Sequence, residues 1–149
     1  MSITNDSEFK AALAKLTPAQ QRMVAARFTD NVLPLCEDPR VVAAVNAAKR
    51  PDITEAELTV VYQAAKTASV ETYTQCGKEA DWRNQASHFV AEAALACVSP
   101  PDRGSNNLAW TVAMNARMAR TCESIANGQG TENREAEQQY RILTEFMNQ

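Results

Sequence analysis

Alanine pairs recur along much of the chain, and they restrict the fold more strongly than any motif in the sequence. The pairs are Ala43-Ala44, Ala47-Ala48, Ala64-Ala65 and Ala93-Ala94. Alanine has the highest intrinsic preference for the α-helix. The β-branched residues are scattered at helical spacing and do not alternate as they would in strands. The sequence therefore predicts an all-α fold, a single-domain bundle of about seven mostly antiparallel helices.

Start and stop signals divide the chain into these helices. We expect them at residues 7–16, 17–35, 38–49, 54–76, 81–98, 106–127 and 132–147. Two of the starts carry a capping box, in which residues three positions apart each bond to the other's backbone. The pairs are Thr17 with Gln20 and Thr54 with Glu57. Pro34 is expected to kink or end the second helix, because proline lacks a backbone donor.

The whole chain is expected to form one domain, with a helix near each end. A length of 149 residues fits a single domain spanning 1–149, with an N-terminal helix within 1–16. Gly77 is expected to end the fourth helix, and Thr131 to cap the seventh. That last segment, 131–149, is predicted to form a charged helix that packs on the bundle. Its apolar stripe consists of Tyr140, Leu143 and Met147.

Small residues indicate where two helices pack most closely. The sixth predicted helix carries a narrow alanine stripe made of Ala109, Ala113, Ala116 and Ala119. We expect this stripe to lie against the fifth helix, at Ala86, Ala93 and Ala94. The fifth helix is apolar nearly all round in its second half, which places it at the centre of the bundle.

Charge and hydropathy disfavour several classes of function. The net charge is -3, whereas a nucleic-acid-binding protein usually shows a basic face. No apolar run approaches the roughly 20 residues of a membrane span, so no membrane partner is expected. The N-terminus is polar and carries Asp6 and Glu8 where a secretory signal would be basic and then apolar. These features predict a cytoplasmic protein.

Catalytic chemistry finds little support in the sequence. His88 is the only histidine, so one chain holds no pair of imidazoles. Glu92, four residues later, is expected to lie on the same helix face as His88. We interpret His88 as a surface or interface histidine that is hydrogen-bonded to its neighbours, the alternative being a general base. No glycine-rich phosphate loop or G-x-S-x-G elbow is present. The prediction is a protein that is not an enzyme and that holds no cofactor.

The four cysteines allow two interpretations. They stand at Cys36, Cys76, Cys97 and Cys122, with no C-x-x-C spacing. If the second, fourth and sixth helices run parallel, Cys36, Cys76 and Cys122 lie near one end of the bundle, where thiolates could bind zinc. Free cysteine is also among the most buried residue types. We favour buried free thiols and expect no metal, while two disulfides remain the alternative for a secreted chain.

Charged residues provide the candidates for partner binding. Asp52, Glu55 and Glu57 gather at the start of the fourth helix, where acids also complement the helix dipole. Their alternative role is an acidic docking face, to which Glu37 and Asp38 are expected to add. Arg117 and Arg120 lie three residues apart on the sixth helix. They either bind an anion or a carboxylate of a partner or lie on the solvated side.

One stretch resembles a known class of proteins. The residues that carry the resemblance are Phe28, Val32-Leu33-Pro34-Leu35, Asp38-Pro39-Arg40, Ala43, Val45, Ala47-Ala48 and Thr54-Glu55-Ala56-Glu57-Leu58. Together with Ala86-Ser87-His88-Phe89-Val90-Ala91, this pattern resembles predicted immunity proteins of bacterial polymorphic toxin systems, in their all-helical, alanine-rich class. The resemblance covers roughly residues 22–125 and is densest at 28–58. It implies a non-catalytic cytosolic protein that binds and neutralises a cognate toxin.

Two other functions remain open at the level of sequence. One is a helical scaffold or adaptor that forms a homo-oligomer through its alanine-lined face. The other is a small-molecule or metal-binding bundle with a pocket near Tyr62, Tyr73 and Trp110. Under the leading interpretation the partner is a protein, and the chain itself is a monomer or a homodimer.

Overall fold

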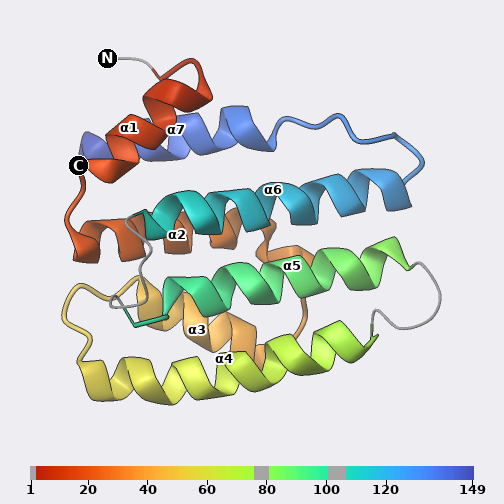
Figure 1. Ribbon diagram of the computed structural model, residues 1–149, viewed down its shortest axis with the longest axis horizontal. Coiled ribbons are helices and arrows are strands. Elements are labelled where there is room, and N and C mark those ends of the chain that lie inside the picture. The colour runs from red at the N-terminus through yellow and green to blue at the C-terminus, as the bar shows by residue number, and fades with distance from the viewer. Residues whose placement is uncertain (1–2, 76–80, 101–106) are drawn as a thin grey trace.

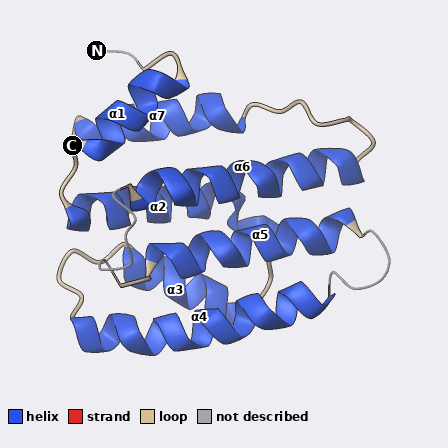
Figure 2. Ribbon diagram, in the orientation of Figure 1, coloured by secondary structure: helices blue, strands red, loops and turns tan. Residues whose placement is uncertain are grey.

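The computed structural model describes residues 3–75, 81–100 and 107–149. Within these ranges the chain forms seven α-helices and one short 3-10 helix, η1, and it contains no strand (Figure 2). The elements are α1 (Asp6–Ala14), α2 (Pro18–Val32), η1 (Leu33–Leu35), α3 (Pro39–Ala48), α4 (Glu55–Gln75), α5 (Trp82–Cys97), α6 (Leu108–Ala126) and α7 (Glu135–Met147). The predicted all-α bundle is confirmed.

Successive helices alternate in direction. From α2 to α7, each helix runs opposite to the one before it (Figure 1). This is the antiparallel arrangement expected from short connections. As a result α4 and α6 begin, and α3 and α5 end, at the same end of the bundle, on the left of Figure 1.

Local capping explains most of the helix boundaries. The capping box of Thr17 and Gln20 is present at the start of α2. At the start of α4, the Glu57 backbone N–H donates to Thr54 Oγ1 at 3.1 Å, and the Thr54 backbone N–H donates to Glu57 Oε1 at 3.3 Å. Pro34 ends α2 as predicted, because the chain tightens into η1 from Leu33 onward.

The seventh helix starts later than predicted, and its cap is wrong. Thr131 is exposed and outside the helix, which begins at Glu135. Gly128 and Gly130 adopt positive φ angles of 74° and 71°, which turn the chain after α6. The Asn133 side chain then accepts a hydrogen bond from the Glu135 backbone N–H at 3.1 Å. The chain therefore stays irregular until Glu135 reaches its buried position. The predicted stop at Gly77 and the thiol of Cys76 lie outside the described residues.

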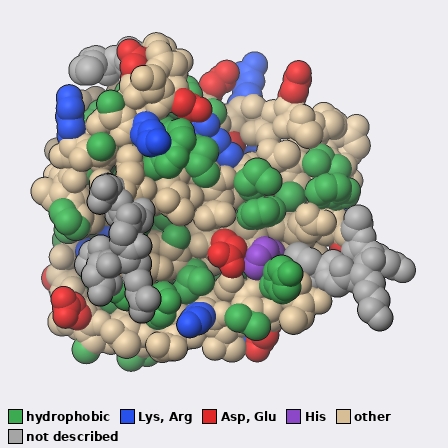
Figure 3. Space-filling model, in the orientation of Figure 1, with side chains coloured by type: hydrophobic (Ala, Val, Ile, Leu, Met, Phe, Trp, Pro, Cys, Tyr) green, Lys and Arg blue, Asp and Glu red, His purple; other side chains and the backbone are tan. Residues whose placement is uncertain are grey.

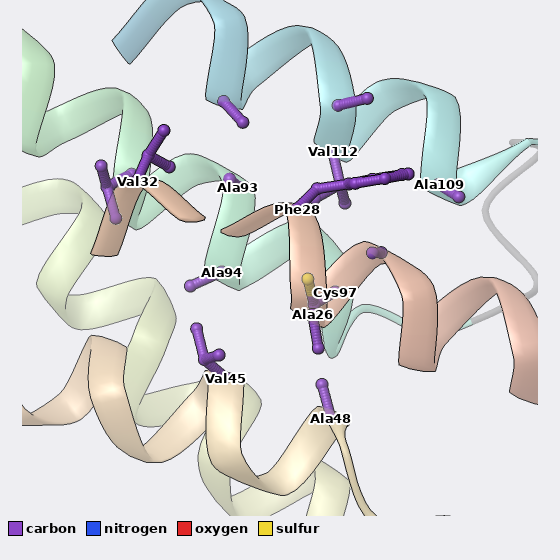
Figure 4. Packing of buried hydrophobic residues seen from close by; sticks show 14 of the residues in the cluster. Ala26, Phe28, Val32, Val45, Ala48, Ala93, Ala94, Cys97, Ala109 and Val112 are labelled. Atoms are coloured by element: carbon purple, nitrogen blue, oxygen red, sulfur yellow. The ribbon is translucent and has the colours of Figure 1, made fainter. Parts of the chain in front are cut away.

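The alanine stripe forms the centre of the core, as predicted. Ala109, Ala113, Ala116 and Ala119 are all fully buried. α5 and α6 form the most extensive helix contact, and α5 also packs on α2, α3 and α4. Figure 4 shows Phe28 of α2 beside Val112 of α6, in the same core. Because the stripe is enclosed within the chain, it is not open to a second copy. A homo-oligomer would have to form through another surface.

Aromatic rings from distant helices hold α1 in place. Phe9 is fully buried, with ring centroids 5.6 Å from Phe28, 6.1 Å from Trp110 and 5.3 Å from Tyr140. The Arg117 guanidinium lies 5.6 Å from the centroid of the Phe9 ring. Rings at these separations attract one another in tilted arrangements. One side chain of α1 thus joins α2, α6 and α7.

The stripe predicted for α7 is only partly correct. Leu143 is fully buried and Tyr140 is half-buried, but Met147 is 42% exposed. The buried face of α7 continues instead through two polar side chains, Glu135 and Gln139, which are 1% and 0% exposed. Both meet arginines of α6, so polar contacts replace part of the expected apolar stripe.

Candidate protein-binding face

The longest helix, α4, lies at the edge of the bundle and has one open side. It packs on α3 and α5 (Figure 1). The residues that it turns inward are Ala65, Ala68, Ser69 and Thr72, all buried. The opposite side of the helix is exposed to solvent over several turns.

The open side of α4 carries large apolar side chains and little charge. Val60 is 70%, Val70 57% and Tyr73 68% exposed. We name as the α4 face the exposed residues Thr59, Val60, Gln63, Lys66, Thr67, Val70, Tyr73 and Thr74. Lys66 is the only charged residue between Glu57 and Glu71. Valine and threonine are mediocre helix formers, so helix stability does not account for their presence here.

The acidic cluster predicted at the start of α4 lies at one end of this face. Asp52, Glu55 and Glu57 are all exposed. Arg50 lies among them, donates to Glu57 at 2.7 Å and comes within 3.6 Å of Asp52. The hydrogen bond from Arg50, followed by those from Thr54, holds the pKa of Glu57 below its ordinary value. Three acids and one arginine leave this end of the α4 face negative.

Glu37 and Asp38 do not join that cluster, which corrects the prediction. They precede α3, whereas the cluster follows it, and a helix of 10 residues separates the two by roughly 15 Å. Asp38 instead pairs with Arg40 at 2.6 Å, and Arg40 also pairs with Glu71. The hydrogen bond from Arg40 lowers the pKa of both carboxyls. Two acids and one arginine therefore mark the other end of the α4 face.

The only histidine borders the α4 face. Since Thr72 donates its single hydroxyl proton to the Ser69 carbonyl at 2.9 Å, His88 Nδ1 donates to Thr72 Oγ1, 3.0 Å away. His88 Nε2 lies 3.7 Å from Glu92 Oε1, which confirms that the two share a helix face. Figure 3 shows His88 in purple beside an acidic side chain.

These contacts are those of a histidine that is hydrogen-bonded to its neighbours. The Ser69 hydroxyl donates to the Glu92 carboxylate, so the serine next to His88 is already bonded to an acid. Tyr73 stacks on His88 with ring centroids 5.6 Å apart. These hydrogen bonds therefore join α4 to α5. The contact with His88 supports the outward position of Tyr73.

The two predicted arginines lie in contacts within the chain. Arg117 donates to both carboxylate oxygens of Asp6, at 2.8 and 2.9 Å, and to Gln139 at 2.8 Å. Arg120 donates to Glu135 at 2.9 Å and to Glu123 at 2.8 Å. Burial opposes the charge of Arg120, but the two carboxylates outweigh it and raise the pKa of the guanidinium. Neither arginine lies on the α4 face.

The cysteines that the structure describes are buried. Cys36, Cys97 and Cys122 all lie in the interior. Burial raises the pKa of Cys97 to about 12, so this sulfur remains protonated at neutral pH. Cys76, the third member of the zinc hypothesis, lies outside the described residues. Among the described ranges, no group of three or more histidine, cysteine, aspartate or glutamate side chains is arranged to hold a metal ion.

The aromatic residues expected to line one pocket belong to different parts of the bundle. Tyr73 stacks on His88, whereas Trp110 packs against Phe9 under Lys10. A small-molecule pocket formed by Tyr73 and Trp110 together is therefore not supported. Within residues 3–75, 81–100 and 107–149, no helix combines the length and hydropathy needed to cross a membrane.

Val60 and Val70 are the site residues that sequence reasoning missed. The sequence signal that could have identified them is the scarcity of charged residues along α4. A helical projection places Gln63, Thr67 and Val70 opposite the buried alanines. Periodicity alone assigns apolar residues to a core. It did not reveal that α4 carries apolar residues on both sides.

Comparison with known proteins finds no match to a family model, to a curated protein or to a solved structure. The resemblance to immunity proteins therefore remains a hypothesis.

Proposed function

We propose that this protein is a non-catalytic protein-binding domain, and that its partner is a bacterial toxin that it neutralises by binding. The α4 face is the docking surface. The toxin as partner rests on the resemblance in residues 28–58, and the location of the surface rests on the structure.

The observation that carries the proposal is the exposure of Val60, Val70 and Tyr73 on one edge helix. Half of the large hydrophobic side chains that are exposed in the described residues lie on α4. Large apolar side chains exposed along one side of a helix are a feature of binding surfaces. The centre of a protein interface is also depleted of charged residues and enriched in tyrosine, as the α4 face is.

The charges at the ends of the α4 face indicate the chemistry of the partner. Both ends carry more acids than bases, with Asp52, Glu55 and Glu57 at one end and Asp38 and Glu71 at the other. A partner with an apolar centre and basic edges complements this pattern. Such complementarity raises the association rate and suppresses wrong partners.

The test uses the toxin encoded beside this gene, produced in the same cells. Wild-type protein should rescue growth and bind the toxin in a one-to-one complex. Val70→Glu places a charge at the centre of the α4 face and should weaken binding about 30-fold or more, the range of a hot-spot residue. Calorimetry measures the affinity, and growth measures the rescue.

Met118→Glu is the matched control. Met118 is 46% exposed on α6, away from the α4 face, so the same change there should leave binding and rescue intact. Equal binding by Val70→Glu and wild type would place the docking surface elsewhere. A neighbouring product that is harmless, or that does not bind, would contradict the toxin as partner.

A further inference from the structure

A cavity of about 680 Å³ lies at the end of the bundle where α4 and α6 begin. It is lined mainly by apolar side chains from five helices and the connections between them. Those on which the inference depends are Leu16, Ala19, Ile53, Leu58, Ala96 and Leu108. The volume falls in the range of roughly 300–1,000 Å³ typical of small-molecule sites.

Two polar side chains of the cavity wall, Gln21 and Ser99, are already bonded within the protein. Gln21 donates to the Leu13 carbonyl at 3.0 Å and accepts from the Ala109 backbone N–H at 3.3 Å. Ser99 donates to the Leu95 carbonyl at 2.8 Å. The cavity therefore presents mainly apolar surface to a ligand. These polar groups are not left open to bond to it.

Arg22 is the one cation among the described residues of the lining, and its partners there are neutral. Its Nε donates to the Ala48 carbonyl at 3.2 Å, and one Nη donates to the Arg50 carbonyl at 2.6 Å. Burial lowers the pKa of Arg22. Among the described residues no carboxylate forms an ion pair with it, whereas the arginines at 40, 50, 117 and 120 each hold at least one.

We infer that the cavity binds a small amphipathic anion, with an apolar chain among Leu16, Leu58 and Leu108 and a carboxylate at Arg22. A carboxylate there would give the partly buried guanidinium the charged partner that its described contacts lack, and hydrogen bonds between ions are the strong ones. Glu55, the one acid that the described part of the lining contains, is exposed at the first turn of α4 and stays in solvent. This site is independent of toxin binding.

Decanoate is the probe, and 1-decanol supplies the same chain without the charge. Calorimetry on the full chain should show one decanoate per molecule, bound about tenfold more tightly than 1-decanol. A tenfold preference corresponds to about 1.4 kcal/mol, close to the lower limit of what a hydrogen bond to a charged group contributes. Absence of decanoate binding, or equal binding of the two ligands, would overturn the inference.

Two substitutions fill the cavity from different helices. Ala96→Phe and Ala19→Phe should each weaken decanoate binding at least about tenfold, since the ring occupies the space of the chain. Ala11→Phe, on the exposed side of α1, is the control and should bind as wild type does. Unchanged binding in both filled variants, each checked for folding by circular dichroism, places the ligand elsewhere and contradicts the inference.

Arg22→Gln tests the charge separately from the shape. Because Arg22 also braces the end of α3, the decisive readout is the ratio of the two affinities. The preference for decanoate over 1-decanol should disappear in Arg22→Gln and persist in Arg22→Lys. A preference that survives in Arg22→Gln would assign the anion to another group.

Discussion

At the scale of single residues, the buried carboxylate of Glu135 depends on specific partners inside the protein. Glu135 is 1% exposed, and its side chain accepts from Arg120 at 2.9 Å and from Asn31 at 2.8 Å. Arg120 also donates to the Asn31 carbonyl at 3.0 Å. These contacts connect α2, α6 and α7 at one point. A charge removed from water is tolerated only where such partners replace its hydration.

Replacing Arg120 with methionine should therefore be strongly destabilising. The change leaves Glu135 buried without its countercharge, and breaking a buried pair in this way costs about 3–5 kcal/mol. Urea unfolding measures the loss. Arg141→Met, on the exposed side of α7, is the control and should change stability by less than about 0.5 kcal/mol.

The double variant Arg120→Met/Glu135→Met should recover part of this loss, because no charge is then left buried. Equal stability of Arg120→Met and wild type would mean that Glu135 reaches water by another route.

At the same scale, the sequence predicts contacts that helix spacing imposes and misses those made by the fold. His88 and Glu92 lie four residues apart on one helix, so their proximity follows from the helical repeat. Arg117 and Asp6 are 111 residues apart, and only the packing of α1 on α6 brings them together. The sequence led us to expect that Arg117 and Arg120 bind a partner's carboxylate or lie on the solvated side, whereas both hold carboxylates of the same chain.

At the scale of the elements, the seam between α5 and α6 depends on small side chains. Ala93 and Ala94 on α5, and Ala113 and Ala116 on α6, are fully buried. Methyl side chains allow helix axes to approach to about 8 Å. The short distance between the two central helices therefore depends on the absence of larger side chains at these positions.

Ala93→Leu should overpack this seam. Additional methylene groups in a well-packed core force side chains from their preferred rotamers and cost about 1–3 kcal/mol. Thermal melting detects the change, and Ala11→Leu on the exposed side of α1 controls for leucine in a helix. An unchanged melting temperature for Ala93→Leu would show that the helices separate without penalty.

Helix starts were predictable wherever capping residues adjoin the helix. The boxes at Thr17 and Thr54 rest on local chemistry, which the sequence displays directly. Thr131 looked equally suitable, yet α7 begins four residues later, at Glu135. The buried contact of Glu135 with Arg120 fixes that start, and a tertiary contact cannot be read from neighbouring residues.

At the scale of the whole molecule, the direction of each helix was predictable and its place in the bundle was not. Short connections give the alternation from α2 to α7. They do not reveal that α4 lies at the edge, because α4 carries large apolar residues both on the side that packs against the core and on its exposed side. The α4 face therefore became visible only in the folded chain.

The stability of the whole molecule should fall in acid. Ion pairs or hydrogen bonds hold the pKa values of Asp6, Asp38, Glu57 and Glu71 below their ordinary values of 3.8 and 4.5. A carboxyl with a lowered folded-state pKa stabilises the fold above its ordinary pKa. That contribution is lost as the pH falls through the lowered value.

Urea midpoints measured from pH 6 down to pH 2 should therefore be steady above about pH 5 and decline below it. Asp6→Asn should flatten part of the decline, since Arg117 then has no carboxylate of α1 to hold. A midpoint that stays constant to pH 2 would contradict these pairings.

The position of Phe9 also has a consequence for biosynthesis. Its ring partners are Phe28, Trp110 and Tyr140, so the last of them is added 131 residues after Phe9 itself. While the ribosome is still extending the chain, this phenylalanine has no enclosed site to enter. Nascent chains that expose apolar residues in this way are the ones that chaperones bind. The first helix can therefore dock fully only after the segment that carries Tyr140 has left the ribosome, and not when the first helices emerge.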